Sequence, residues 1–315
     1  MYHPYFRGKL NELLTIRETA SLISGLGFVP IIEPVKEALN GLTRTIQAVI
    51  SQDDRVIVVV NPFHGDLASS HDSISSLLNT DFADQQNVAA GVLLKATTTT
   101  EDVLRCCRTH RDRPLALIHA GFADPKNLVR ELSSYSEQIR HVFFEEDCGK
   151  LYQKNFQGSY RVLIRDGFQR RKNREHPELE LFSDLHATFE LEGMNGFGDF
   201  LIVGDDYSDS GGPAYAVAIH LTFIDAENDG AMYIHHFVSD RQDTPKDPAG
   251  KFLEALRKMM AKLGPPGSSP IMETAAVTEF RALYARRHFP GLGYIKKLSM
   301  QHHIETLADY FANRS

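Results

Sequence analysis

The sequence predicts an α/β protein, a closed (β/α)8 barrel of the TIM type. Three observations lead to this fold class. Eight short runs rich in β-branched or apolar residues occur along the chain, each run ends in or beside a polar residue, and helix-compatible stretches separate most of them. The runs are apolar throughout, which is typical of parallel strands covered on both faces. An open doubly wound sheet is the alternative, and we favour the barrel.

The predicted strands follow one another in chain order and are each about six or seven residues long, as expected for a buried strand. They occupy residues 28–33, 55–61, 89–95, 114–119, 140–145, 160–165, 199–204 and 215–220.

Helix signals lie between these strands. Residues 37–51 carry apolar side chains at the spacing of one helix face. Further helix starts are marked by a capping residue, by acids in the first turn or by a proline at the first helical position. They are expected at residues 100–102, 124–125 and 183–184.

The closing part of the chain departs from the repeat. Residues 204–213 are rich in turn formers and too few for a helix, so they predict an antiparallel hairpin that joins strands 199–204 and 215–220. A further strand is expected over 231–238, and Asp247 and Pro248 begin a long helix that runs toward Leu263.

The domain boundary is expected at the segment 264–270, which is rich in Gly, Pro and Ser. We therefore predict a barrel-like domain over residues 1–263 and a C-terminal helical extension over 264–315 that packs on the barrel.

Composition excludes several classes. The chain has 315 residues, is 42% hydrophobic and carries a formal charge of −7, which suits a globular protein and argues against a protein that coats nucleic acid. No apolar run approaches the roughly 18 residues that span a bilayer, and the N-terminus lacks a signal-peptide pattern, so we expect no membrane partner and a cytoplasmic location. Three cysteines make no disulfide framework.

A ring of polar residues follows the predicted strands. In a (β/α)8 barrel the carboxyl ends of the strands converge on one mouth, where ligands bind. The alternative is a plug of ion pairs that satisfies the end of the core. The ring consists of Glu33, Asn61, Lys95, His119, Glu145 and Arg165, with Asp166 one residue further on.

Catalytic roles are assigned to four members of the ring, His119, Glu145, Glu33 and Lys95, and Arg165 is assigned to ligand binding. His119 is the proton shuttle, because its ordinary pKa lies near neutrality. Lys95 and Arg165 clamp an anionic ligand, and the same cations keep Glu33 and Glu145 ionised as bases or metal ligands. Two alternatives stay open: His119 as a hydrogen-bonded core histidine, and Lys95 as a Schiff-base lysine.

A divalent cation is a further alternative, since Glu145 and Asp147 share one face of an extended strand and offer oxygen ligands. No cofactor is identified. A glycosidase needs two opposed carboxylates, and in the common barrel families one of them comes from the fourth strand. The fourth predicted strand, 114–119, ends in His119, which weakens the comparison with glycosidases. Barrel phosphodiesterases of the glycerophosphodiester type carry a histidine-arginine motif after the first strand. The sequence has Glu33-Pro34 at this position, so it does not resemble them.

The most basic part of the chain follows the strand 160–165. Arginines match phosphate geometry through paired hydrogen bonds, so a phosphorylated ligand or a nucleic-acid backbone is a candidate partner. The alternative is a solvated loop that the acids of residues 175–180 neutralise. The loop carries Arg165, Arg170, Arg171, Lys172 and Arg174, and Arg7 and Lys9 form a second basic candidate near the rim.

Other motifs lead to no site. Residues 205–216 lack the ligands of a calcium loop, and no Walker loop or complete dinucleotide fingerprint is present. His235 and His236 are adjacent on a predicted strand, so they face opposite sides and do not readily share a metal.

Five segments carry a family resemblance: YHPYFRGKLNE (2–12), IIEPVK (31–36), DFLIVGD (199–205), GGPAYAVAIHL (211–221) and HFVSD (236–240). They resemble an uncharacterised bacterial family similar to the beta protein family, which is named for a phage protein. The resemblance covers nearly the whole chain and implies a barrel-like fold and a bacterial or phage-linked origin. It brings no activity, but the matching positions suggest candidate site residues: Glu33 as a catalytic residue, and Arg7, Lys9, Asp199, Asp205 and His220 as ligand-binding residues.

Two functions are carried forward. The first is an enzyme, a hydrolase or lyase acting on a phosphorylated substrate at the barrel mouth. The second is a non-catalytic protein that binds a ligand or a protein partner in a phage-linked or mobile-element defence system. A purely structural role of the polar ring is the third alternative.

Overall fold

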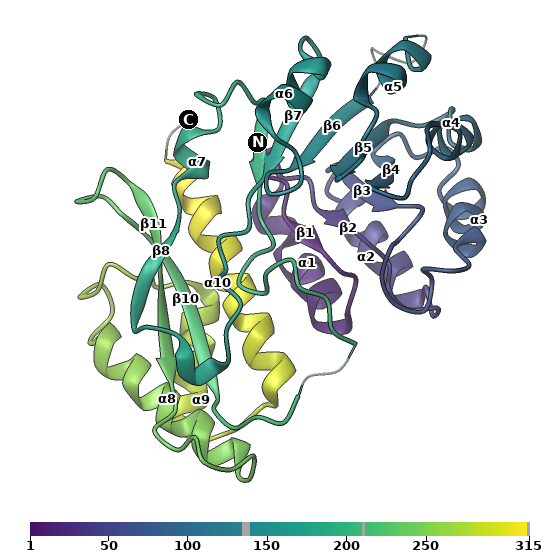
Figure 1. Ribbon diagram of the computed structural model, residues 1–315. Coiled ribbons are helices and arrows are strands. Elements are labelled where there is room, and N and C mark those ends of the chain that lie inside the picture. Colours follow the sequence, from purple (N-terminus) through teal and green to yellow (C-terminus); the bar gives the residue numbers. More distant parts are fainter. Residues whose placement is uncertain (134–138, 210–211, 314–315) are drawn as a thin grey trace. The chain divides into compact units, whose positions relative to one another are not determined.

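The computed structural model describes residues 1–133, 139–209 and 212–313 (Figure 1). The chain divides into two compact units. The barrel unit comprises Met1–Asp166 and Thr188–Phe200, and the second unit comprises Gly167–Ala187 and Leu201–Ser315. The predicted domain boundary after residue 263 does not coincide with these units, whose boundaries follow Asp166, Ala187 and Phe200.

Eight parallel strands form the sheet of the barrel unit. In sheet order they are β1 (Tyr5–Phe6), β2 (Ile31–Ile32), β3 (Val56–Val59), β4 (Val88–Lys95), β5 (Leu115–Ala120), β6 (Ile139–Phe144), β7 (Tyr160–Ile164) and β9 (Gly196–Gly198). The two ends of the sheet meet through a parallel bridge between Tyr2 and Phe197, and the His3 amide donates to the Phe197 carbonyl at 2.7 Å. The predicted (β/α)8 barrel is therefore confirmed.

Two of the eight strands are not those predicted. β1 has two residues, too few for an apolar run, and β9 contains two glycines. A Cβ at Gly198 would overlap the carbonyl oxygen of His3, so close strand contact excludes the side chains on which a sequence pattern depends. The predicted strand 199–204 begins just past β9, and its residues 201–203 form a turn.

The hairpin expected between residues 199–204 and 215–220 is replaced by another one. The antiparallel hairpin joins β10 (Ala218–Asp225) to β11 (Ala231–Val238). The strand predicted at 215–220 thus starts later and belongs to the second unit.

Helices follow the first six barrel strands (Figure 1). Two predicted helix starts agree with the structure to within one residue. Thr99 caps one helix in a capping box with Asp102, and Asp124 caps the next helix, which has Pro125 at its first position. These helices are α1 (Leu10–Ile23), α2 (Asn40–Ile50), α3 (Asp72–Asp81), α4 (Thr100–Thr109), α5 (Pro125–Glu131) and α6 (Lys150–Gln153), which continues into the 3-10 turn η1 (Lys154–Phe156).

The barrel interior is apolar, and it fixes which side chains point inward. Ile118 and Ala120 on β5 and Phe144 on β6 belong to the interior cluster. Because side chains alternate along a strand, His119 on β5 faces outward.

The second unit has a three-stranded antiparallel sheet in the order β10, β11, β8 (Leu179–Ser183). One face of this sheet packs Ile219 and Leu221 into a core with residues of the helices. The helices are α8 (Pro248–Leu263), α9 (Ala275–Arg286) and α10 (Leu292–Ala312), with a short α7 (Leu185–Thr188) after β8. The strand predicted over 231–238 and the helix capped by Asp247 are confirmed. In the described residues, no helix has the length and apolar character needed to cross a bilayer.

Candidate functional site

Glu33 lies after β2 at the barrel mouth and is completely buried. Its carboxylate accepts hydrogen bonds from the Tyr5 hydroxyl at 2.9 Å and from the amides of Phe63 at 2.8 Å and His64 at 3.2 Å, and it forms an ion pair with Arg7. Burial alone would raise the pKa of Glu33, but Arg7 and the Phe63 amide outweigh it, so the pKa is lowered. These contacts fit the structural alternative, a satisfied ion pair at the end of the core.

The same network fixes Arg7. Its amide donates to the Glu12 carboxylate at 2.5 Å, and its guanidinium carbon lies 5.1 Å from the ring centre of Tyr5 and 5.6 Å from that of Phe200. Lys9 comes next as the residue that precedes α1. The Arg7 charge therefore acts on internal partners.

Asn61 and Lys95 occupy inward positions of the mouth. The Asn61 side chain donates to the Leu93 carbonyl at 2.9 Å and accepts from the Leu93 amide at 2.7 Å, so it ties β3 to β4. The Lys95 ammonium lies 5.3 Å from the ring centre of Phe63 and 5.9 Å from that of Phe144. Among the described residues no acid pairs with it, which leaves Lys95 as a cation of the mouth that a ligand can use.

Glu145 and Arg165 form a bidentate ion pair at the rim. Arg165 donates from Nε at 2.5 Å and from a terminal nitrogen at 3.0 Å to the two oxygens of Glu145, and both side chains are more than a quarter exposed. Asp166 follows Arg165, and Asp147 is exposed two residues after Glu145. Within the described residues, Glu145 and Asp147 belong to no group of three metal-ligand side chains.

His119 is not among the mouth residues. It is completely buried against α6 and η1, where its Nδ1 lies 2.7 Å from the Tyr152 hydroxyl and its ring centre 4.6 Å from that of Phe156. Its Nε2 lies 3.0 Å from Nδ1 of His141. Burial, followed by the charge of His141, lowers the pKa of His119 far below its usual value. The structure thus places His119 as a core histidine, because its strand position faces outward.

Buried histidines predict acid lability. Burial lowers the pKa of His3 to about 3 and that of His110, His141 and His302 to about 4. The unfolded chain takes up these protons near pH 6.5 and the folded chain does not, so the free energy of unfolding falls as pH drops from about 6.5 toward 4. Urea denaturation at pH 7.5, 6 and 5 measures this loss. Equal stability at all three would contradict it.

The other predicted ligand-binding residues meet internal partners. Asp199 accepts a hydrogen bond from the buried Tyr2 hydroxyl at 2.7 Å. In the basic loop, Arg170 pairs with Asp206, while Arg171 pairs with Glu180 at 2.7 Å. Lys172 and Arg174 lie 3.8 and 4.0 Å from Glu175, and Asp205 is half-buried beside Asp206. Acids neutralise the loop, as the alternative interpretation expects.

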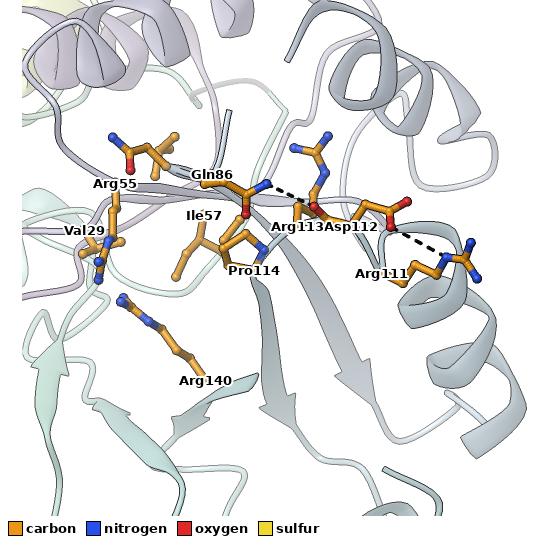
Figure 2. A pocket seen from close by; sticks show the side chains of 12 residues that line it. Val29, Arg55, Ile57, Gln86, Arg111, Asp112, Arg113, Pro114 and Arg140 are labelled. Carbon is orange, nitrogen blue, oxygen red and sulfur yellow. Dashed lines mark hydrogen bonds and ion pairs between the residues drawn. The ribbon is translucent and has the colours of Figure 1, made fainter. Parts of the chain in front are cut away.

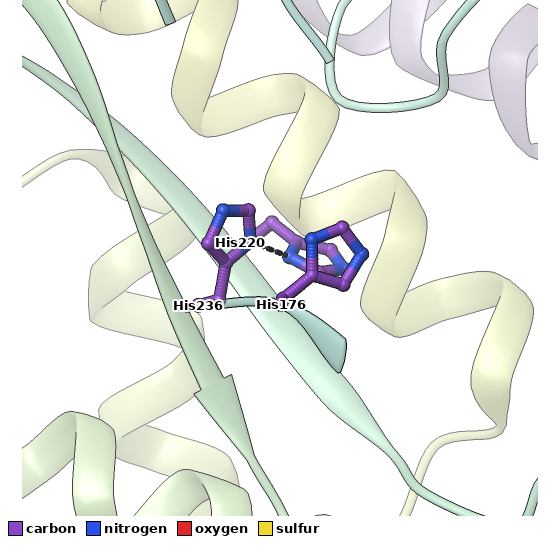
Figure 3. A group of neighbouring side chains, drawn as sticks. All are labelled: His176, His220 and His236. Atoms are coloured by element: carbon purple, nitrogen blue, oxygen red, sulfur yellow. Dashed lines mark hydrogen bonds between the residues drawn. The ribbon is translucent and has the colours of Figure 1, made fainter. Parts of the chain in front are cut away.

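Three histidines converge in the second unit (Figure 3). His220 on β10 and His236 on β11 are direct cross-strand partners, and their Nδ1 atoms lie 2.7 Å apart. His176 precedes β8, which pairs with β11, and its ring stacks on that of His236 at 4.4 Å between centres. One ring nitrogen from each histidine lies within 4.8 Å of the other two, and all three residues are buried. We call this group the histidine triad.

Glu180 supports the triad from β8. Its Oε1 lies 3.0 Å from Nε2 of His236, and Arg171 donates to both oxygens of Glu180 at 2.7 and 2.8 Å. A carboxylate on the far nitrogen of a histidine fixes the ring and its tautomer. His236 therefore turns Nδ1 toward His220.

All three imidazoles are neutral at pH 7. Burial, followed by the charges of its neighbours, lowers the pKa of His236 to about 4, although Glu180 opposes the shift. Burial also lowers the pKa of His220, far below its usual value, and that of His176. A neutral imidazole is the form that binds a metal.

The triad was not predicted as a unit. His235 and His236 do face opposite sides, as expected: His235 contacts the Glu178 carbonyl at 3.1 Å and stacks on Phe223. The partners of His236 come from other segments, however. His220 was singled out only by the family resemblance, and His176 carried no signal.

Comparison of the chain with protein-family models, curated proteins and solved structures gave no match. The resemblance to the beta protein family stays a prediction, and the function is argued from the site itself.

Proposed function

We propose that the chain is a zinc-dependent hydrolase whose metal centre is His176, His220 and His236. The observation that carries this proposal is the convergence of three neutral imidazole nitrogens within 4.8 Å. Imidazole is a preferred ligand of Zn²⁺, and sites with three protein ligands keep a fourth position for water or substrate, whereas structural sites are closed by four ligands.

Glu180 is not one of the three proposed ligands, so a zinc ion held by the triad would have its fourth position left for water or substrate. The Glu180 carboxylate lies on the far nitrogen of His236 and is held by Arg171, so it acts as an orienting partner. A zinc ion held by the triad would lower the pKa of a bound water toward neutrality and so supply the nucleophile for an ester or amide.

An anionic substrate is the class we propose for this centre. The charge of Lys296 contributes to the low pKa of His220, and that of Arg171, which Glu180 holds, contributes to the low pKa of His176. Cations beside a metal attract an anionic ester and stabilise the charge that develops on it. This keeps the expectation of a phosphorylated substrate but moves its centre from the barrel mouth to the second unit.

Zinc titration tests the proposal. The chain is stripped with a chelator and titrated with Zn²⁺ by calorimetry, and hydrolysis of 4-nitrophenyl phosphate and bis(4-nitrophenyl) phosphate is followed with and without the metal. We expect one zinc per chain and hydrolysis that requires zinc. No zinc uptake would contradict the metal centre, and uptake without hydrolysis of either ester or of an amide panel would contradict the enzyme.

Glu180→Gln is expected to weaken zinc binding about 10- to 100-fold, the usual effect of losing a partner that orients a metal-bound histidine. Glu178→Gln is the matched control, because its side chain is exposed on the same segment. Equal zinc affinity of the two variants would show that Glu180 does not orient the site.

Binding of an anionic ligand at the barrel mouth is a second candidate function. The ammonium of Lys95, held against two aromatic rings and paired with no described acid, favours it. The ion pairs of Arg7 and Arg165 then serve as the walls of the mouth. A non-catalytic role with a protein partner stays a prediction.

A further inference from the structure

A cavity of about 630 Å³ opens at the amino ends of strands β2 to β6, the end of the barrel away from its mouth (Figure 2). Val29, Ile57 and Ala89 line it and also belong to the apolar barrel interior. The volume is that of a typical small-molecule site. The cavity thus combines an apolar floor with an open polar rim.

Arginines dominate the rim. Two of the four have partners within the chain: the exposed Arg111 lies 3.7 Å from the exposed Asp112, and the buried Arg113 donates to the carbonyls of Leu78 at 2.6 Å and Val88 at 3.2 Å. These contacts explain why Arg111 and Arg113 are present without a ligand.

Arg55 and Arg140 have no such explanation. Their guanidinium groups converge on one side of the cavity (Figure 2). In the parts of the chain that the structure describes, no carboxylate or carbonyl accepts a hydrogen bond from either. Arg140 lies with its guanidinium carbon 4.9 Å from the ring centre of Tyr160. Burial lowers the pKa of Arg140; Tyr160 opposes this shift, and the charge of Arg55 adds to it. An anion between the two would remove this repulsion.

We propose that this cavity binds a small organic phosphate, with Arg55 and Arg140 on the phosphate group and the apolar floor against the organic part. Paired arginines match the oxygens of a phosphate in geometry and charge. The site lies entirely within the barrel unit and uses no residue of the histidine triad, so it is independent of the proposed hydrolase.

Phenyl phosphate and inorganic phosphate are the probes, and EDTA is present so that metal binding plays no part. We expect phenyl phosphate to bind more tightly than inorganic phosphate and to raise the melting temperature. Arg55→Gln and Arg140→Gln should each weaken phenyl phosphate binding about tenfold or more, the loss of one charge-assisted hydrogen bond. Arg108→Gln is the control, because Arg108 pairs with Glu101 on the surface of α4.

The melting temperature without ligand separates a binding role from a structural one. Relief of repulsion predicts that Arg55→Gln is as stable as the native chain or more stable, and Arg55 is exposed, so its variant should fold. A native chain that binds neither probe, or an Arg55→Gln variant that binds like Arg108→Gln, would overturn the proposal and leave the zinc result untouched.

Discussion

Replacing His220 by glutamine is expected to reduce zinc affinity by more than about 100-fold, beyond the loss expected for an orienting partner alone. His220 supplies one of three ring nitrogens, and two imidazoles from His176 and His236 are too few to hold the ion tightly. Zinc-dependent hydrolysis should fall with the affinity. Calorimetry measures the affinity, and the zinc-induced rise in melting temperature gives an independent readout.

His235→Gln is the matched control for this loss. His235 lies on the same strand next to His236, but its ring stacks between Phe223 and Phe237 on the other face of the sheet. We expect the control to bind zinc like the native chain even if its stability falls. If both variants bind zinc equally well, the three histidines are not its ligands.

Glu33→Gln is expected to lower the free energy of unfolding by about 3–5 kcal/mol, because it removes the Glu33 charge from its ion pair with the buried Arg7. Since domains are stable by only about 5–15 kcal/mol, this loss is a large fraction of the total. Urea denaturation at pH 7 measures it.

Glu145→Gln provides the comparison. Glu145 and Arg165 form an equally close pair, but water reaches both side chains, so we expect a loss of only about 0–1 kcal/mol. Similar losses for the two variants would mean that Glu33 does not anchor the mouth. A small effect of Glu33→Gln on stability would instead favour a role of the Glu33 carboxylate in ligand binding.

Two members of the polar ring, Lys95 and His119, each end an apolar run but face opposite sides of their strands. The sequence predicts Lys95 at the mouth because Lys95 ends an apolar strand, and in the structure it takes an inward position at the end of β4, with its ammonium near the Phe63 ring. His119 ends a similar run, but it lies one residue out of phase with the interior, beside Ile118 and Ala120. A continuous apolar run does not indicate which residues point into the barrel, since both faces of the strand are buried.

The sequence by itself determined the barrel class and six of its eight strands, because buried parallel strands and their capped helices leave continuous apolar runs and capping residues that can be recognised locally. The other two strands, β1 and β9, leave no such run. Only the tertiary structure decided the sites. Cross-strand register brings His220 against His236, and the pairing of β8 with β11 adds His176. The convergence of Arg55 and Arg140 likewise follows from the positions of β3 and β6 in the sheet. These contacts join residues from 16 positions apart (His220 and His236) to 85 positions apart (Arg55 and Arg140), so no local sequence pattern predicts them.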